Sequence, residues 1–276
     1  MNFDNQLPIL ITFDGEARSG KGTVVQAVKD YIRDQMDKKV MLIDAGQVFR
    51  VLVVGASRAG IDLDDPVAID KFLADDDQAE QCVKLVKQVY DMDKTQRDSL
   101  LYTNEVGRNS AKIGARPLSQ AFKDELLKRW LRDARDEGYE IVLLDGRALE
   151  ETGSMLEEKG LCDFKISLYF ICDATVGARR TLGYADRSYH ALSDEQKNEV
   201  NELVDQINAR NESDRVRKVQ PIVRPDSEPS LLPKKVLASY SKNRVVSLIN
   251  TSAEMSKTDM VQPVAEFVEK VLNKNE

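Results

Sequence analysis

Five short apolar runs in the chain are typical of buried parallel strands. They are Ile9–Phe13, Val40–Ile43, Glu140–Leu144, Ile166–Ile171 and Val245–Ile249. Longer stretches with helical spacing separate or follow them, at Gly22–Met36, Pro66–Tyr90, Ser99–Ile113, Pro117–Glu137, Ser193–Arg210 and Met260–Asn273. Because strand and helix patterns alternate, the sequence predicts an α/β fold in which helices cover both faces of a five-stranded parallel sheet.

Two segments have a pattern that fits insertions better than core. Residues 51–110 are acidic, helical in spacing and without an obvious strand, whereas residues 179–224 are basic. In phosphate-transfer folds such segments often bind the substrate or close over it. We therefore predict a core made of residues 1–50, 111–178 and 225–276, a helical acceptor-binding insert at 51–110 and an arginine-rich lid at 179–224.

The first apolar run leads directly into a loop that is bounded by glycines and followed by a helix-compatible stretch. Glycines let the backbone bend so that several N–H groups point at phosphate oxygens, and a lysine at the end of the loop adds a cation for the outer phosphates. The alternative is a plain Gly/Ser loop between two core elements. The register of strand, loop, lysine and helix favours nucleoside triphosphate binding, by Gly15, Ser19, Gly20, Lys21, Gly22 and Thr23.

The residue after the loop lysine narrows the class of protein. In the general motif a Ser or Thr hydroxyl directly follows the lysine and ligates Mg²⁺. Here Gly22 takes that position, and the hydroxyl comes one residue later, at Thr23. This ending is more typical of small nucleoside monophosphate kinases than of GTPases or motor ATPases, and in those kinases we expect the metal to be held largely through waters.

A carboxylate stands at the end of another predicted strand, where Ile141–Leu144 is followed by Asp145, Gly146 and Arg147. An acid beside a phosphate loop can orient Mg²⁺ or its waters. A strand followed by Asp-Gly is also a common turn signal. In combination with the upstream loop, the pattern predicts that Asp145 and Thr23 hold the metal, mainly through its water shell.

Several arginines lie where they could bind anionic groups. Arg50 follows the second predicted strand, although a solvated helix residue is the default interpretation of a lone arginine. In a helix, Arg210, Asp214 and Arg217 would share one face at i, i+4 and i+7, which alternatively forms a surface ion-pair ladder. The pair Arg179-Arg180, earlier in the same basic segment, favours a lid that brings guanidinium groups over transferring phosphates.

Composition excludes several classes of protein. The formal net charge of −7 argues against a dedicated nucleic-acid surface, and no apolar run approaches the roughly 18 residues of a membrane span. One histidine, His190, excludes a multi-histidine metal site or histidine-based acid–base catalysis. The cysteines lack metal-ligand spacing and are expected to pack as small hydrophobes in a reducing compartment. These cysteines are Cys82, Cys162 and Cys172. We predict a cytoplasmic monomer without a nucleic-acid or membrane partner.

In their order along most of the chain, these motifs resemble the cytidylate kinase branch of the nucleoside monophosphate kinases. The resemblance implies a P-loop kinase that transfers the γ-phosphoryl group of ATP, with Mg²⁺, to a nucleoside monophosphate, with CMP or dCMP as the expected acceptor. The matching segments are Ile11-Thr-Phe-Asp-Gly with Gly20-Lys-Gly-Thr23, Asp44-x-Gly-x-x-Phe-Arg50, Glu105-Val106, Asp145-Gly-Arg147, Ala178-Arg-Arg180, and Arg210-x-x-x-Asp214-x-x-Arg217 with Pro221-Ile222.

The resemblance also implies roles for individual residues. Asp214 would bind the ribose of the acceptor, and its phosphate would be gripped by Arg50, Arg147 and Arg217. The catalytic groups around the ATP phosphates would be Lys21 of the loop and the lid residues Arg179, Arg180 and Arg210.

The positions that read the base in that family differ in this chain. Ala45 replaces a serine of the second motif, and Ala148 replaces an aspartate that follows Asp-Gly-Arg. Two further base-contacting positions hold Ala111 and Gln120 instead of serine and arginine. A site reads a base through hydrogen-bond complementarity, so the identity of the base stays open. We predict a rearranged base pocket that contains Ser110, Arg116 and Gln120.

Two alternative functions remain at this stage. A P-loop kinase could act on a non-nucleotide metabolite, because small-molecule kinases share the donor loop. A non-catalytic ATP-binding regulatory protein could keep the donor loop and lack acceptor recognition. The altered base-reading positions and the helical insert favour the second alternative.

Overall fold

The computed structural model describes residues 6–241 and 243–275, which form two compact units. Unit 1 takes the described residues of Met1–Ile43, Leu131–Val216 and Gln220–Glu276, and unit 2 takes Asp44–Trp130 and Arg217–Val219. The core, insert and lid given above are functional segments, and their boundaries stay predictions.

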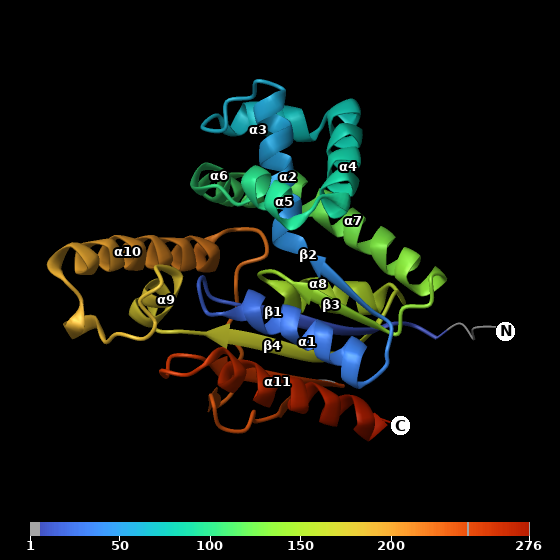
Figure 1. The fold of residues 1–276 in the computed structure, drawn as a ribbon. Helices are drawn as coiled ribbons and strands as arrows, with labels where there is room; N and C mark the ends of the chain where they lie inside the picture. The colour runs from blue at the N-terminus through green and yellow to red at the C-terminus, as the bar shows by residue number, and fades with distance from the viewer. Residues whose placement is uncertain (1–5, 242, 276) are drawn as a thin grey trace. The chain divides into compact units, whose positions relative to one another are not determined.

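A seven-stranded, mostly parallel sheet forms the centre of unit 1 (Figure 1). Its order is β2-β3-β1-β4-β7-β5, and the short strand β6 pairs antiparallel with β7. The strands are β1 (Ile9–Gly15), β2 (Val40–Asp44), β3 (Ile141–Asp145), β4 (Asp163–Ile171), β5 (Pro229–Leu231), β6 (Ser239–Ser241) and β7 (Arg244–Asn250). Since β1 lies between β3 and β4 and is parallel to both, the chain leaves the sheet after β1 and after β3 at the same edge.

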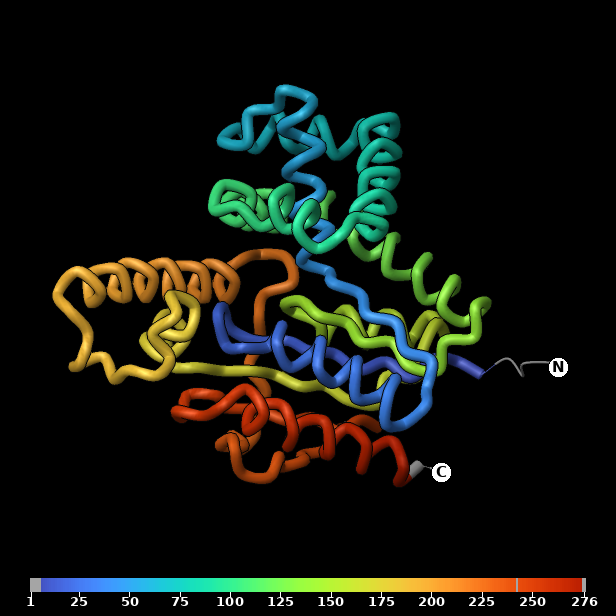
Figure 2. The backbone as a smooth tube through the Cα atoms, in the orientation of Figure 1, coloured from blue at the N-terminus to red at the C-terminus, as the bar shows by residue number. Residues whose placement is uncertain are grey.

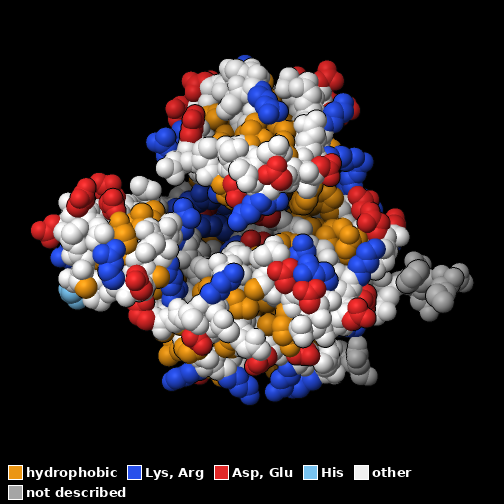
Figure 3. Space-filling view, in the orientation of Figure 1, with side chains coloured by type: hydrophobic (Ala, Val, Ile, Leu, Met, Phe, Trp, Pro, Cys, Tyr) orange, Lys and Arg blue, Asp and Glu red, His pale blue; other side chains and the backbone are white. Residues whose placement is uncertain are grey.

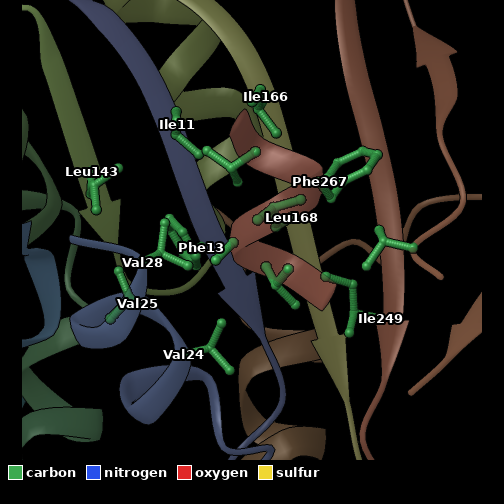
Figure 4. Close-up of a cluster of buried hydrophobic side chains, with 14 of the residues drawn as sticks. Ile11, Phe13, Val24, Val25, Val28, Leu143, Ile166, Leu168, Ile249 and Phe267 are labelled. Carbon is green, nitrogen blue, oxygen red and sulfur yellow. The ribbon is translucent and has the colours of Figure 1, made fainter. Parts of the chain in front are cut away.

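Helices cover both faces of this sheet, as the sequence predicts for an α/β fold. Helices α1 (Lys21–Gln35) and α11 (Lys257–Leu272) pack on one face, and α8 (Leu149–Glu158) packs on the other. The first face holds the main apolar core, in which Phe13 of β1 and Leu168 of β4 contact side chains of α1 and α11 (Figure 4). Burying this surface is the principal stabilising contribution to the unit.

Two helices of unit 1 come after β4 in the chain, at the sheet edge where the glycine-bounded loop also lies. Helix α9 (Ala174–Thr181) begins directly after β4, and α10 (Asp194–Val216) follows the short 3₁₀ helix η1 (Tyr189–Ala191). The two helices lie side by side (Figures 1 and 2) and share a small apolar cluster that includes Ala178 and Ile207. The described residues end in a second 3₁₀ helix, η2 (Asn273–Asn275).

Unit 2 is helical. It contains α2 (Ala45–Arg58), α3 (Pro66–Leu73), α4 (Asp76–Asp91), α5 (Lys94–Leu101), α6 (Asn104–Gly114) and the larger part of α7 (Pro117–Asp136). Two apolar clusters hold these helices around α2, one of which includes Val51 and Val89 and the other Leu52 and Ile113. The helical character predicted for residues 51–110 is therefore confirmed.

The sequence-based prediction was wrong in several details. The sheet has seven strands rather than five, because β5 and β6 are three-residue strands without an apolar run. The stretch Pro66–Tyr90 is two helices, since the Asp75 side chain caps α4 at Gln78 N. The stretch Ser99–Ile113 is likewise divided, because Thr103 caps α6. Three helices that follow strands directly or after a short turn, α2, α8 and α9, are absent from the prediction.

The described residues include no helix that combines the length and the apolar character that a membrane-spanning segment requires. Lysine and arginine side chains are interspersed with acidic ones on the surface that Figure 3 draws. His190 is exposed, next to Tyr189. Cys82 and Cys162 are buried free thiols, and burial raises their pKa values to about 11 and about 12, respectively.

Candidate active site

The loop between β1 and α1 leaves a run of main-chain N–H groups without an internal acceptor. The N–H groups of Gly15, Glu16 and Ala17 donate to Asp14 Oδ1, the carbonyl of Phe170 and Asn211 Oδ1, at 2.6, 2.9 and 2.8 Å. The N–H groups of Thr23 and Val24 both donate to the carbonyl of Gly20. Within the described part of the chain, no acceptor is bonded to the N–H groups of residues 18–22. Free N–H groups at a helix N-terminus form a binding site for an anion such as phosphate.

Two glycines give the loop its path. Gly15 has a φ of 138°, and a Cβ there would collide with the main chain of Phe170. Gly20 has a φ of 83° and is the N-cap of α1. Both conformations belong to the region that favours glycine, which explains why these two positions bound the loop. Between them, Ser19 is buried and donates its hydroxyl to the carbonyl of Glu16 at 3.0 Å, while Gly22 is exposed in the first turn of α1.

The structure brings the loop lysine and the β3 acid together. Lys21 Nζ forms an ion pair with Asp145 Oδ1, and both side chains keep about one seventh of their surface exposed. A carboxylate and a hydroxyl are the oxygen donors that suit Mg²⁺. Asp145 at the end of β3 and Thr23 in the first turn of α1 therefore fit a metal held with waters and phosphate oxygens. No cluster of three or more His, Cys, Asp or Glu placed to hold a metal occurs among the described residues.

Asp14 is a site residue that the sequence analysis missed. Its side chain is buried, and its two carboxylate oxygens accept the N–H groups of Gly15 at 2.6 Å and Leu149 at 2.7 Å. Helix α8 has Ala148 as its N-cap, with no capping bond from that residue's own side chain. The carboxylate of Asp14 in β1 therefore caps α8, although the strand that precedes α8 in the chain is β3. Burial raises the pKa of Asp14, against the opposing effect of these N–H groups and of Lys21.

Three of the expected site residues form a charged cluster in unit 1. Asp214 Oδ2 pairs with Arg147 Nη1 and, at 3.1 Å, with Arg210 Nε. The Asp214 side chain is 4% exposed, whereas Arg147 and Arg210 are 20% and 32% exposed. The pair between Arg210 and Asp214 matches the i, i+4 spacing seen in the sequence. Burial lowers the pKa of Arg147 while Asp214 opposes that shift.

Helix α10 is also tied directly to the glycine-bounded loop. Asn211 is buried and accepts the N–H of Ala17, and Arg215 Nη2 pairs with the Glu16 carboxylate at 2.8 Å. Sequence reasoning missed Asn211, because an asparagine within a helical run has no local signal for a partner 194 residues away. The expected lid segment thus contacts the loop through its own side chains.

The two adjacent arginines of α9 bind the segment that follows β7. Arg180 donates from Nη1 to the carbonyl of Thr251 at 2.8 Å and from Nη2 to that of Ala253 at 2.6 Å. Arg179 is buried and pairs with Glu254 at 2.6 Å. Thr251 in turn donates its hydroxyl to the carbonyl of Ser19 at 2.8 Å. These contacts connect α9, the segment after β7 and the glycine-bounded loop.

Arg50 lies in α2 of unit 2. Its guanidinium carbon is 4.5 Å from the ring centroid of Tyr102, and Nη1 donates to the carbonyl of Leu101 at 2.9 Å. The Asp44 side chain accepts the N–H of Gln47 at 3.0 Å and so caps the same helix. Arg50 is therefore held in place by its neighbours and is not a solvated helix residue.

The residues expected near the base have internal partners in unit 2. Ser110 is buried and donates to the carbonyl of Gly107 at 2.8 Å, and Arg116 pairs with both oxygens of Asp70. Gln120 is buried and donates to the carbonyl of Gly114.

Arg217 is half-buried and lies just beyond α10, which ends at Val216. The prediction that Arg217 shares a helical face with Arg210 and Asp214 was therefore wrong.

Comparison with known proteins adds to this geometry. A family model described as cytidylate kinase matches residues 11–230. The cytidylate kinase of Aeromonas hydrophila is 30% identical over 224 residues, which cover 79% of this chain and 83% of that protein. That of Aeromonas salmonicida is 29% identical over 224 residues with the same shares. That of Pediococcus pentosaceus is 26% identical over 217 residues, or 78% and 83%. The matched region includes the glycine-bounded loop, β3, α9 and α10.

Proposed function

Because the chain belongs to the cytidylate kinase family, and is thereby a nucleoside monophosphate kinase, we propose that it transfers the γ-phosphoryl group of ATP to CMP or dCMP. The products are ADP and the nucleoside diphosphate. The observation that carries the choice of donor is the run of N–H groups at residues 18–22, which includes that of Lys21. This arrangement supplies what a triphosphate requires, namely several aligned donors and a cation.

The reaction needs positioning and charge neutralisation more than covalent help. An acceptor phosphate oxygen is already a nucleophile and needs no general base. Lys21 and the loop N–H groups hold the donor phosphates, while Arg210 and Arg179 neutralise charge around the transferring group. Arg50, Arg147 and Arg217 bind the acceptor phosphate, and Asp214 binds its ribose. These roles follow from the family resemblance.

Mg²⁺ is the proposed metal. When bound, it neutralises negative charge on the donor phosphates and aligns them. Asp145 and Thr23 are the proposed contacts, through its water shell. The Lys21–Asp145 pair supports this proposal, because it keeps a carboxylate next to the cation that contacts the same phosphates. The cytoplasmic location and the monomeric state stay predictions.

The test is ADP formation from Mg-ATP with CMP, dCMP, UMP, AMP, GMP or no acceptor, measured in parallel. We expect stimulation by CMP or dCMP. Stimulation by a different monophosphate would keep the reaction and change the substrate. If ATP binds and no monophosphate stimulates ADP formation, the proposed function is wrong, and a metabolite kinase or an ATP-binding regulatory protein becomes the better assignment.

A further inference from the structure

Tyr102 connects two residues of the motif Asp44-x-Gly-x-x-Phe-Arg50 in unit 2. Its hydroxyl donates to Asp44 Oδ2 at 3.0 Å, and the Arg50 guanidinium lies over its ring with the carbon 4.5 Å from the centroid. The residue before it, Leu101, accepts a hydrogen bond from Arg50 Nη1 at 2.9 Å. Tyr102 belongs to the helical insert and to none of the motifs that carry the family resemblance.

The backbone of Tyr102 is fixed on both sides. Leu101 ends α5 and is fully buried, and the N–H of Tyr102 donates to the carbonyl of Asp98 at 2.9 Å. Thr103, the next residue, caps α6 by accepting the N–H of Val106 at 3.2 Å. Tyr102 is therefore held between a buried anchor and a helix cap, so its main chain has a defined position.

The partner of its hydroxyl is also fixed. Asp44 uses Oδ1 to cap α2 at Gln47 and Oδ2 to accept from Tyr102. Partial burial of Tyr102, which keeps 45% of its surface exposed, and the charge of Asp44 both raise its pKa, so its hydroxyl stays a donor. The cap of α2 thus sets the Tyr102 ring, and the ring sets the arginine that lies farther along the same helix.

An arginine that binds a phosphate gains affinity when its guanidinium is oriented before the ligand arrives, because less side-chain freedom is lost on binding. A cation over an aromatic face also keeps its N–H edge available to an anion. We propose that Tyr102 is a positioning residue for the acceptor phosphate, acting through Arg50. This inference rests on the proposed function, which assigns Arg50 to that phosphate.

The test measures KM for CMP, KM for ATP and kcat in Tyr102→Leu and Tyr102→Phe. Tyr102→Leu should raise KM for CMP roughly three- to tenfold and leave KM for ATP unchanged, as the loss of a cation–π contact implies. Tyr102→Phe keeps the ring and should raise KM for CMP less, by roughly twofold. Tyr139→Leu is the matched control, because Tyr139 of unit 1 also carries a cation, with Lys39 Nζ 4.4 Å from its ring centroid. This control should leave both KM values unchanged.

A double-mutant cycle separates positioning from general stability. In an Arg50→Ala background, Tyr102→Leu should produce no further rise in KM for CMP, whereas a purely structural role would give additive effects. Additive effects, or equal rises in KM for CMP and ATP, would overturn the inference. If Tyr102→Leu does not fold, Tyr102→Phe decides, and an unchanged KM for CMP then overturns it. If the wild-type chain phosphorylates CMP and Tyr102→Leu behaves like it, only this inference is wrong. If the wild-type chain phosphorylates no monophosphate, the proposed function fails together with it.

Discussion

The carboxylate of Asp14 accepts the main-chain N–H of Leu149 at 2.7 Å, which joins the end of β1 to the first residue of α8. Its other oxygen accepts the N–H of Gly15 at the start of the glycine-bounded loop. Asp145 ends β3 and Arg147 lies in the turn between β3 and α8, and the family resemblance implies metal and phosphate contacts for these two residues. One buried side chain therefore fixes the loop that is proposed to bind the donor relative to the turn that carries these two residues.

Asp14→Asn should weaken both the fold and the reaction. Asparagine replaces one carboxylate oxygen with an NH₂ group, so one of the two buried N–H donors loses its acceptor. An unsatisfied buried donor costs about 1–3 kcal/mol of unfolding free energy. We expect a loss in that range in urea unfolding, together with a lower kcat. Wild-type stability and kcat in this variant would contradict the role of Asp14.

The same variant should change how stability depends on pH. Burial raises the pKa of Asp14 in the folded protein, so the folded state binds more protons than the unfolded state at pH values above the ordinary aspartate pKa of about 3.9. The contribution of Asp14 to the unfolding free energy therefore falls as the pH rises from that value to the raised pKa. Asp14→Asn should lack this decline. If the unfolding free energies of the wild-type protein and the variant change with pH in the same way, Asp14 does not make this contribution.

Lys21→Ala tests the donor site. The variant removes the cation at the end of the loop and leaves Asp145 without that partner. Removing one group that stabilises transition-state charge lowers kcat by roughly 100- to 1,000-fold. We expect a loss of at least that size with an unchanged circular dichroism spectrum. Lys29→Ala, a lysine farther along α1, is the control and should keep normal turnover. Near-normal activity of a folded Lys21→Ala protein would remove Lys21 from the donor site.

Local signals made the sheet and the loop predictable from the sequence. The five long strands are mostly apolar runs, Gly15 and Asp145 end two of them, and Gly20 and Lys21 stand where α1 begins. What the sequence did not reveal depends on partners far along the chain. Asn211 and Asp14 are ordinary polar residues until the fold brings them to Ala17 and Leu149.

Helix ends were a second source of error. The apolar spacing continues through Asp75 and Thr103, so a single periodicity predicts one helix where the side chains of these residues cap a new one. Arg217 illustrates the consequence for function. Its expected place on the face of α10 required the helix to continue through residue 217, but α10 ends one residue earlier, at Val216. Residue roles drawn from spacing alone are therefore least secure near a helix end.

Asp214→Ala should destabilise the protein. Asp214 is almost fully buried and pairs with Arg147, which is mostly buried as well, and with Arg210. Removing one partner of a buried ion pair leaves an uncompensated charge, at a cost of about 3 kcal/mol. Urea unfolding should show a loss of that order. The matched control is Asp205→Ala, an exposed acid on the same helix, which should leave the unfolding free energy unchanged. Equal unfolding free energies of the two variants would mean that water compensates the charges of Arg147 and Arg210 when Asp214 is removed.

Arg180→Ala tests whether this arginine acts on the donor site through the segment after β7. Both of its terminal nitrogens donate to carbonyls of that segment, at Thr251 and Ala253, and Thr251 is bonded to Ser19 of the loop. Hydrogen bonds from a charged group contribute about 1.5–3 kcal/mol each, so we expect KM for ATP to rise at least tenfold. KM for CMP should stay unchanged.

The response of kcat distinguishes two roles for Arg180. If it holds the segment, Arg180→Lys should behave like Arg180→Ala, because an ammonium group cannot reach two carbonyls in the fixed geometry of a guanidinium. If it contacts the transferring phosphate, kcat should fall in Arg180→Ala at constant KM for ATP, and lysine should restore part of it. Arg33→Ala, which removes an exposed arginine of α1 paired with Asp34, controls for the loss of a positive charge. The contacts of Arg180 with Thr251 and Ala253 favour the first outcome, so we expect Arg180→Lys to leave KM for ATP high.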